Sequence, residues 1–449
     1  MKNHLAEFVA IMKKHKLNDI VIKNFSTQYE KVLAGETGII SESDIKPPQK
    51  NNLIYYKDIN DTSDRNLNKL VVFKLNGGLG TSMGLSRAKS LLQVKDDKTF
   101  LDIIALQILQ LLKNSGKHIP LMFMNSFNTR RDTLKKMSEY QELKVNGLPL
   151  DFIQNKFPKI QQEDMAPLNS ANDENNWNPP GHGEIYLVLQ TSGILDLLLE
   201  KGYEYAFISN SDNLGAVVDN KILNFIAEAD IPFLMEVCER TEMDKKGGHL
   251  AETKDGQLLL REVAQCPASE LESFQDINKY KYFNTNNLWI NLNHLKAKLM
   301  QMDQVFSLPL ILNKKEVEGR KVFQIETAMG AAISCFKNSK ALIVNRGRFV
   351  PVKKTNDLLC LWSDTYKLSP EYHLILDNKH GVSPVVELDE NYYKNIDQLE
   401  ERVIEIPSLK ECKSLKIEGN VFLGKDVVFK NDVSIKTDKK ILISNKAYS

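Results

Sequence analysis

The residues with the clearest chemical potential lie in a glycine-rich loop, LNGGLGTSMG at 75–84, which is followed by Lys89. Gly77 and Gly78 have no Cβ, so backbone N–H groups there can approach phosphate oxygens closely. Lys89 carries a positive charge that can neutralise a phosphate. An apolar run at 70–75 precedes the loop and predicts a buried parallel strand. The order of strand, loop and lysine predicts a phosphate-binding loop, with a glycine-rich surface turn as the alternative.

The spacing of these glycines disfavours two common nucleotide-binding motifs. A dinucleotide-binding GxGxxG motif would need a glycine where Met83 stands. A P-loop that starts at Gly78 would need Gly-Lys at 83–84, where the chain has Met83 and Gly84. The loop therefore argues against a nicotinamide-dependent Rossmann enzyme and against a P-loop ATPase.

A second candidate is Asp212, at the tip of the stretch SNSDNLGA. Mg²⁺ prefers oxygen ligands and commonly takes one or two protein carboxylates together with substrate phosphates. Asn210 and Asn213 flank this tip and supply uncharged hydrogen-bonding groups. Because a lone aspartate after a strand is more often a helix cap or a turn former, a magnesium site at Asp212 is a hypothesis that the residues alone leave open.

Two further stretches carry polar groups suited to a ligand. In NPPGHG, Gly181 exposes backbone and His182 can donate to an anion, although a loop histidine on its own more often has no role. FNTNNLWINL places Asn284 and Asn286 at alternate positions of a predicted strand, so both side chains lie on one face. Since buried amides without partners are costly, this pair favours a polar ligand such as a sugar.

The elements that must position these groups alternate along the centre of the chain. Such alternation predicts an α/β fold with a doubly wound, mostly parallel sheet, with ligands bound outside the carboxyl ends of the strands. Gly77, Gln154 and Asp212 all follow predicted strand ends. The pattern predicts strands at 120–127, 150–155 and 205–210, helices capped by Thr99 and at 129–137 and 184–202, and a hairpin over 247–265.

The two ends of the chain follow other patterns. Residues 1–40 have helical spacing of apolar side chains, and 41–52, with two adjacent prolines, indicates a linker. Near the C-terminus, apolar residues recur every six positions, which is typical of a parallel β-helix, with a β-meander as the alternative. This series is Leu409, Leu415, Val421, Val427 and Val433. We expect an N-terminal helical segment with its linker at 1–60, a catalytic domain at 61–395, and a short left-handed β-helix at 396–449.

Composition limits the classes of function. The chain has 59 basic and 58 acidic side chains, a net charge of +1, so no overall charge attracts nucleic acid or a membrane. Its 5 cysteines are scattered without a CxxC pair, which argues against a zinc knuckle and a disulfide framework. Residues 1–16 lack a long apolar core, so no signal peptide is expected. These features predict a cytoplasmic protein.

Taken together, the motifs resemble those of the eukaryotic-type UDP-glucose pyrophosphorylases (UTP–glucose-1-phosphate uridylyltransferases). The matching stretches keep the order LNGGLGTSMG, PPGHG, NSDNLGA, KGG, FNTNNLW, ETAMGAA and RFVPVKKTNDLL, between about residues 70 and 435. GLSRAKS at 84–90 departs from the GCKGPKS common among animal and plant members, but Lys89 keeps its place. The resemblance implies a Rossmann-like nucleotidyltransferase sheet and a reaction of UTP with glucose 1-phosphate that yields UDP-glucose and pyrophosphate.

The resemblance also implies roles for individual residues, with Mg²⁺ as the cofactor. Catalysis falls to Lys353, Lys89 and Asp212, and Asp212 is the implied metal ligand. Gln154 is the implied uracil reader, because an amide can both donate and accept. The implied nucleotide-binding residues are Leu75, Asn76, Gly77, Gly78, Lys89, Gln154 and Gly181, and the implied sugar-phosphate-binding residues are His182, Asn210, Ser211, Asp212, Gly248, Glu262, Asn284 and Asn286.

Two alternatives to this function stay open from the sequence. One is a related pyrophosphorylase that uses another sugar 1-phosphate, such as galactose or N-acetylhexosamine, although the close FNTNNLW match speaks against the latter. The other is a non-catalytic sugar-nucleotide sensor, which should have lost a charged catalytic residue, whereas Lys89, Asp212 and Lys353 are all present. The C-terminal region often makes oligomer contacts in the family, so a homo-oligomer through that region is a further expectation.

Overall fold

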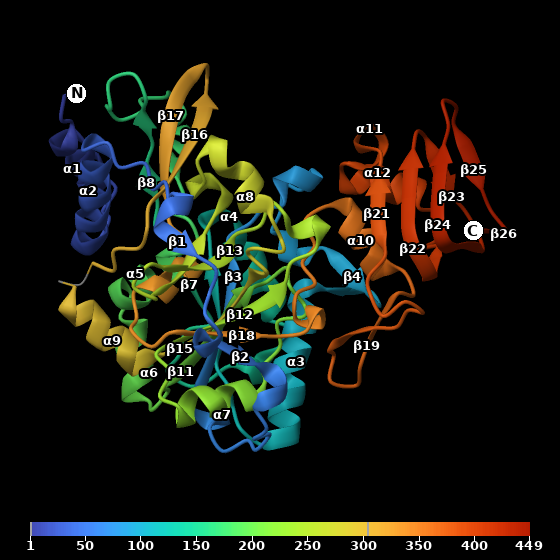
Figure 1. Cartoon of the computed structure of the whole chain (residues 1–449), viewed down its shortest axis with the longest axis horizontal. Coiled ribbons are helices and arrows are strands. Elements are labelled where there is room, and N and C mark those ends of the chain that lie inside the picture. Colours follow the sequence, from blue (N-terminus) through green and yellow to red (C-terminus); the bar gives the residue numbers. More distant parts are fainter. Residues whose placement is uncertain (1, 303–304) are drawn as a thin grey trace.

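The computed structural model describes residues 2–302 and 305–449, and a large mixed sheet forms its centre (Figure 1). All the strands of its main path run in the same direction except one, β15, which is antiparallel to both neighbours. The mostly parallel α/β sheet expected from the sequence is therefore confirmed. The main path is β2 (Leu53–Tyr55), β18 (Lys340–Ile343), β12 (Phe233–Glu239), β15 (Tyr282–Asn291), β11 (Tyr205–Asn210), β3 (Leu70–Asn76), β6 (Leu121–Asn125) and β7 (Asp151–Ile153).

Helices cover both faces of this sheet and bury its strands completely at the centre. Every residue of β3 is buried, because Val72 faces one hydrophobic core while Val71 and Phe73 face the other. The first core is covered by α3 (Phe100–Ser115), α4 (Phe127–Met137) and α7 (Asn220–Glu228), and the second by α5 (Glu184–Thr191), α6 (Ile194–Glu200) and α9 (Leu292–Gln301).

Local sequence signals set the ends of two of these helical stretches. Thr99 caps α3 as expected, in a capping box with Asp102. The single helix expected over 184–202 is wrong, because the chain breaks into α5 and α6 at Gly193, whose φ is +74°. A left-handed glycine is a common helix terminator, so this break follows from the residue type.

The N-terminal helices pack on the edge of the main domain. α1 (Leu5–Lys14) and α2 (Asp19–Leu33) bury Phe8, Phe25 and Tyr29 in a core shared with Phe157 and Leu310. The helices expected within 1–40 are therefore confirmed. Among the described residues, no helix has both the length and the apolar character needed to cross a membrane.

The segment expected to be a linker, 41–52, is instead attached to the domain. Its strand β1 (Ile45–Lys46) pairs antiparallel with β13 (His249–Thr253), which forms the expected hairpin with β14 (Leu258–Arg261). Glu42 also accepts a 3.0 Å hydrogen bond from Arg261. The adjacent prolines interrupt helix formation without releasing the backbone, because the residues on either side find partners.

The C-terminal segment forms parallel strands, on the right in Figure 1. One sheet has the order β21 (Val385–Leu388), β22 (Ser408–Glu418), β24 (Val427–Lys436) and β26 (Lys446–Tyr448), and a second pairs β23 (Val421–Leu423) with β25 (Ile441–Ile443). All five residues of the six-residue series are buried. Parallel pairing with a repeatedly buried position excludes the β-meander, in which neighbouring strands are antiparallel.

Candidate active site

The candidate residues meet at the edge of the sheet where the parallel strands end. The backbone N–H of Ser211, just past β11, donates to the carbonyl of Leu75 on β3 at 3.0 Å. A Cβ added to Gly77 would lie 3.2 Å from the amide nitrogen of Gln154, just past β7. Because β15 runs the other way, its first half, with Asn284, also lies at this edge. The expected convergence of the three strand ends is confirmed.

The glycine-rich loop leaves backbone open beside a fixed lysine. Gly80 and Gly84 adopt left-handed φ values of +68° and +76° on either side of a short turn. A Cβ added to Gly78 would meet no atom within 4 Å, so this part of the loop faces open space. The backbone N–H of Lys89 donates to the carbonyl of Gly78 at 3.2 Å and brings the lysine back over the loop.

Lys89 and Asp212 form an ion pair at the centre of the site. The Lys89 Nζ lies 2.6 Å from Asp212 Oδ2, and it also donates to the backbone carbonyl of Val352. Both side chains stay partly exposed, at 15% and 25%. The two residues expected to act on phosphate and metal are therefore adjacent, and both face solvent from which an anionic ligand can approach.

The surroundings of Asp212 fit a divalent ion that would be bound mainly by phosphate oxygens and water, with little contribution from the protein. No group of three or more histidine, cysteine, aspartate or glutamate side chains that could hold a metal occurs within residues 2–302 and 305–449. The Asp212 carboxylate is 25% exposed and the loop over Gly78 is open, so this carboxylate could join phosphates and water around an ion. This donor set suits Mg²⁺, which commonly binds through one or two carboxylates and substrate phosphates.

Asn76 and Ser211, expected to bind nucleotide and sugar phosphate, direct their side chains inward. Ser211 Oγ donates to Asn76 Oδ1 at 3.0 Å, and Asn76 Nδ2 donates to Asn125 Oδ1 at 2.9 Å and to Thr133 Oγ1 at 2.7 Å. These bonds tie together the ends of β3, β6 and β11. The side chains of Asn76 and Ser211 therefore position the loop. Any contact of these two residues with a ligand would come from their backbone groups.

The turn that carries Gly181 and His182 is fixed on the ETAMGAA segment. Gly181 has φ +82°, and a Cβ there would lie 2.4 Å from the carbonyl oxygen of Thr327, so only glycine fits. The backbone N–H of Met329 donates to His182 Nδ1 at 3.0 Å. Burial lowers the pKa of His182 to about 4, so the ring is neutral at neutral pH and carries its proton on Nε2. His182 is therefore a neutral donor.

A buried carboxyl group that the sequence did not single out lies beside Gln154. Glu184, the first residue of α5, accepts a hydrogen bond from the side chain of Asn155. Burial raises the pKa of Glu184 to about 8. At neutral pH this carboxyl group is largely protonated, so it anchors Asn155 without adding a negative charge at this edge of the sheet.

Four of the residues expected to bind sugar phosphate lie together, namely Gly248, Glu262, Asn284 and Asn286. A Cβ added to Gly248 would lie 2.6 Å from Glu262 Oε2, so the carboxylate packs directly over the glycine. The backbone N–H of Asn284 donates to the carbonyl of Gly248 at 3.2 Å. Asn284 Nδ2 donates to Asn286 Oδ1 at 2.8 Å, and Asn286 has φ +58° beside a register shift between β15 and β12. The two amides therefore pair with each other rather than simply sharing a strand face.

Lys353 and Lys354, adjacent in sequence, face different partners. Burial raises the pKa of Glu262, and the positive charge of the nearby Lys353 partly offsets this rise. Lys354 Nζ instead lies 2.7 Å from Glu390. The structure thus separates the expected catalytic lysine, near the residues expected to bind sugar, from a neighbour held in a surface ion pair.

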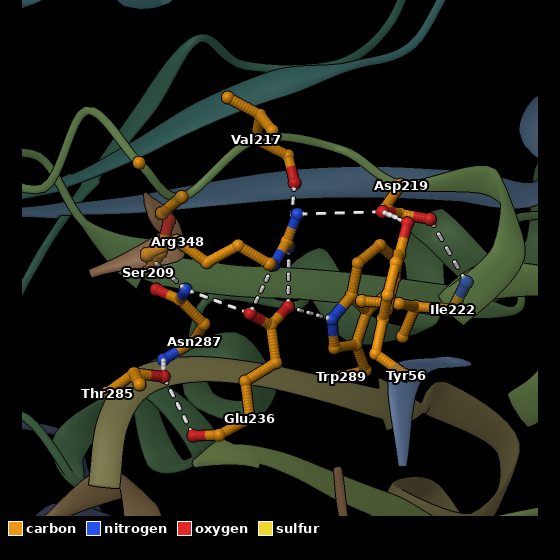
Figure 2. Close-up of polar contacts among 12 residues, drawn as sticks. Tyr56, Ser209, Val217, Asp219, Ile222, Glu236, Thr285, Asn287, Trp289 and Arg348 are labelled. Atoms are coloured by element: carbon orange, nitrogen blue, oxygen red, sulfur yellow. Dashed lines mark hydrogen bonds and ion pairs between the residues drawn. The ribbon is translucent and has the colours of Figure 1, made fainter. Parts of the chain in front are cut away.

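A buried ion pair that sequence reasoning missed supports the Lys353 segment (Figure 2). Arg348 donates from Nε and Nη2 to the two carboxylate oxygens of Glu236, both at 2.6 Å. Trp289 Nε1 and Asn287 Nδ2 donate to the same carboxylate at 2.8 and 3.0 Å. Glu236 is fully buried, so these bonds are necessary to hold its charge.

Asn213 connects this ion pair to the tip that carries Asp212. Its Nδ2 donates to the backbone carbonyl of Arg348 at 3.1 Å, and its Oδ1 accepts from the N–H of Val350 at 2.9 Å. The N–H of Val352 then donates to the carbonyl of Asp212 at 3.2 Å. The segment that ends at Lys353 is therefore bound along its length to the Asp212 tip.

Comparison with known proteins agrees with this architecture. A sequence profile described as UTP–glucose-1-phosphate uridylyltransferase matches residues 22–430. The chain is 40% identical to the UTP–glucose-1-phosphate uridylyltransferase of Musa acuminata, over 98% of this chain and 95% of that one. It is 44% identical to the protein of the same name from Pyrus pyrifolia, over 85% of this chain and 81% of that one.

Solved structures of similar proteins cover the whole fold. A UDP-glucose pyrophosphorylase variant from Leishmania major in complex with UDP-glucose aligns with a TM-score of 0.92 and 43% identity, over 100% of this chain and 99% of that chain. A UDP-glucose phosphorylase from Trypanosoma brucei aligns with a TM-score of 0.91 and 42% identity, over 99% and 98%. Similarity in sequence and in fold therefore points to one family along nearly the full length.

Proposed function

Since the chain belongs to the UTP–glucose-1-phosphate uridylyltransferase family, we propose that it forms UDP-glucose and pyrophosphate from UTP and glucose 1-phosphate. A phosphate oxygen of glucose 1-phosphate attacks the α-phosphorus of UTP in line, the bond from that phosphorus to the bridging oxygen breaks, and pyrophosphate leaves. No protein nucleophile is needed, so catalysis consists of positioning two anions and stabilising charge. The observation that carries this proposal is the Lys89–Asp212 pair beside an open glycine-rich loop.

The nucleotide side of the site comprises residues 75–89, 154–155, 181–184 and 209–213. The backbone around Gly77 and Gly78 would bind phosphate oxygens, and Lys89 would neutralise the triphosphate. Gln154 and the backbone of Gly181 would read the uracil edge. These roles are supported by the contact of Gln154 with Gly77 and by the open space over Gly78.

The sugar side comprises residues 247–248, 262, 284–286 and 346–353. Glu262 would accept hydrogen bonds from glucose hydroxyls, and the paired amides of Asn284 and Asn286 would bind others. His182, as a neutral donor, together with Asn210 would contact the sugar phosphate. Lys353 would stabilise negative charge at the α-phosphate.

Mg²⁺ is the cofactor that we propose, with Asp212 as its protein ligand. When bound, it supplies positive charge that offsets the repulsion between the two phosphates and stabilises the charge of the transition state. The Lys89 ammonium would move from Asp212 to the phosphates as these enter. The pair is partly exposed, so phosphates can reach Lys89 and a cation can reach Asp212, and each partner replaces one charged contact with another.

For the remainder of the chain we propose the organisation expected from the sequence, with domains at 1–60, 61–395 and 396–449. The parallel strands and the buried six-residue series support a short β-helix in the last of these, for which we propose left-handed winding. The protein would work in the cytoplasm, where UTP and glucose 1-phosphate are available, and a homo-oligomer would form through the C-terminal region.

The test is pyrophosphate release from UTP and a panel of sugar 1-phosphates with Mg²⁺, for the wild type, Lys353→Ala and Lys354→Ala. We expect turnover with glucose 1-phosphate, a loss of about 10²–10³ in kcat for Lys353→Ala, and near wild-type rates for Lys354→Ala, a matched control. Turnover only with another sugar phosphate would favour a related pyrophosphorylase. Binding of UDP-glucose without any turnover would favour a sensor.

A further inference from the structure

One surface arginine contacts the loop before Gly247, strand β15 next to Asn284, and a ring of its own segment. Arg346 lies in the turn that leads toward Lys353, and its Nη1 and Nη2 lie 2.6 and 2.9 Å from the carboxylate oxygens of Asp244. Asp244 belongs to the loop that ends in Gly247 and Gly248. This two-bond contact ties the sugar-binding loop to the segment that carries the catalytic lysine.

Asp244 in turn organises its own loop. The N–H and the hydroxyl of Thr241 donate to Asp244 Oδ2 at 2.9 and 2.8 Å, and the N–H of Gly247 donates to the Asp244 carbonyl at 2.9 Å. Burial alone would raise the pKa of Asp244, but the hydrogen bonds and charge of Arg346 outweigh it, so the pKa is lowered. The carboxylate is therefore ionised at neutral pH, and every one of these bonds converges on it or on its backbone.

Two aromatic rings extend the contact from Arg346 toward Asn284 and Lys353. The guanidinium carbon lies 5.0 Å from the ring centre of Phe283 and 6.0 Å from that of Phe349. The two rings are 4.9 Å apart and meet edge to face. Lys353 Nζ lies 5.9 Å from the same Phe349 ring, so one stack joins the arginine to the lysine.

We propose that Arg346 is a positioning residue that holds the Gly247–Gly248 loop in register with Lys353 and so sets selectivity among sugar 1-phosphates. This inference rests on the proposed function and extends it. The Arg346 side chain is 41% exposed and that of Asp244 only 10%, so a surface arginine is held on a largely buried carboxylate that itself organises the loop. The contact therefore links the position of this loop to residues 346–353.

The first test compares steady-state kinetics of Arg346→Ala with those of Arg320→Ala. Arg320 is equally exposed and pairs with Glu318 at the turn before β17 (Arg320–Glu326), so it controls for the loss of a surface arginine. For Arg346→Ala we expect a KM for glucose 1-phosphate about 10-fold higher, a KM for UTP within about two-fold of wild type, and poorer discrimination against galactose 1-phosphate. The proposal would be overturned if KM changed equally for glucose 1-phosphate and UTP, or if the KM values of Arg346→Ala equalled those of Arg320→Ala.

Two further variants separate the geometry of the contact from its charge. Arg346→Lys keeps the charge but loses the two-pronged contact, so it should fall between wild type and Arg346→Ala. Asp244→Asn combined with Arg346→Ala should be no worse than the more damaging single variant, because both remove one contact. Additive effects in the double variant would contradict a shared role.

A measurement that needs no turnover keeps this inference separate from the proposed function. In hydrogen exchange of the full-length protein, Arg346→Ala should speed amide exchange across residues 241–249 by about 10-fold, with residues 75–89 unchanged. Unchanged exchange in 241–249 would refute the positioning role even if the enzyme is active. Faster exchange there without any wild-type turnover would support the positioning role and refute the reaction.

Discussion

The nucleotide side and the sugar side of the site are built in different ways. On the nucleotide side, the ends of adjacent strands are joined by short contacts such as the 3.0 Å bond from Ser211 Oγ to Asn76 Oδ1. On the sugar side, Gly248, Glu262 and Asn284 come from a hairpin and an antiparallel strand, and residues 346–353 reach them from far along the chain. The sheet itself therefore sets the geometry of the proposed nucleotide side, whereas the geometry of the proposed sugar side depends on polar contacts between distant parts of the chain.

The largest effect should come from breaking the buried ion pair behind the sugar side. Arg348→Met leaves the carboxylate of Glu236 buried without its main partner, which should cost about 3–5 kcal/mol of unfolding free energy. Denaturant unfolding measures this loss. Adding Glu236→Leu to Arg348→Met should recover part of the stability, because no charge is then left unpaired although Trp289 Nε1 loses its acceptor. The activity with glucose 1-phosphate should stay low, because the Lys353 segment loses the side-chain anchor at Arg348. Full recovery of both would show that the pair does not position the site.

The next effect lies at Asp212, where the two sides meet. Asp212→Asn keeps the shape but removes the charge, so we expect kcat to fall by about 10²–10³ and the Mg²⁺ concentration for half-maximal rate to rise. Titration of Mg²⁺ in the pyrophosphate assay measures both. An unchanged Mg²⁺ dependence would show that Asp212 is not the metal ligand.

A smaller effect is expected at Lys74, a buried residue that contacts both flanks of the Asp212 tip on the nucleotide side. Its Nζ donates to Ser209 Oγ and to the Ala216 carbonyl, both at 2.8 Å. Burial, assisted by the charge of Arg348, lowers the pKa of Lys74 to about 7. Between pH 7 and the higher pKa of the unfolded state, the unfolded chain binds more protons, so this group favours folding more as pH rises.

Lys74→Met should remove that pH dependence. The free energy of unfolding of the wild type, minus that of Lys74→Met, should rise between pH 7 and 9 by up to about 1.4 kcal/mol per pH unit. Denaturant unfolding at several pH values gives this difference directly. A difference that stays constant with pH would mean that the lysine keeps an ordinary pKa when the protein folds.

The smallest effect is expected at His182, whose substitution should leave the shape of the pH profile of kcat/KM unchanged. Its pKa, lowered by burial to about 4, keeps the ring neutral from pH 5.5 to 8, and charging would begin only as pH falls toward 4. In pH profiles of kcat/KM, wild type and His182→Gln should therefore differ by a constant factor over this range. An inflection near pH 6.5 that His182→Gln lacks would contradict the neutral-donor role.

Sequence reasoning placed the glycine-rich loop and the strand ends correctly because both depend on local patterns. A run of apolar residues ending in glycine or in Ser-Asp-Asn indicates where a strand stops, and parallel strands bring those stops together. The failures also have local causes. Gly193 ended a helix inside an otherwise helical pattern, and the prolines near residue 47 concealed a strand pair with residues 252–253.

The contacts that support the sugar side could not be read from spacing, because Arg346 and Arg348 meet partners about a hundred positions away. One signal was available: Glu236 interrupts the apolar run PFLMEVC. A charge inside a strand that should be buried on both faces requires a partner of opposite charge. Only the folded structure shows which residue supplies that charge, and here it is Arg348.

The most direct test of the account is a crystal structure of this protein with UDP-glucose bound. We expect the uracil edge at Gln154 and Gly181, the diphosphate between Lys89 and Lys353, and the glucose hydroxyls at Glu262 and Asn284. That arrangement would confirm that the two sides of the site bind the two halves of one product. UDP-glucose bound away from this edge of the sheet, or bound with the sugar remote from Glu262, would contradict it.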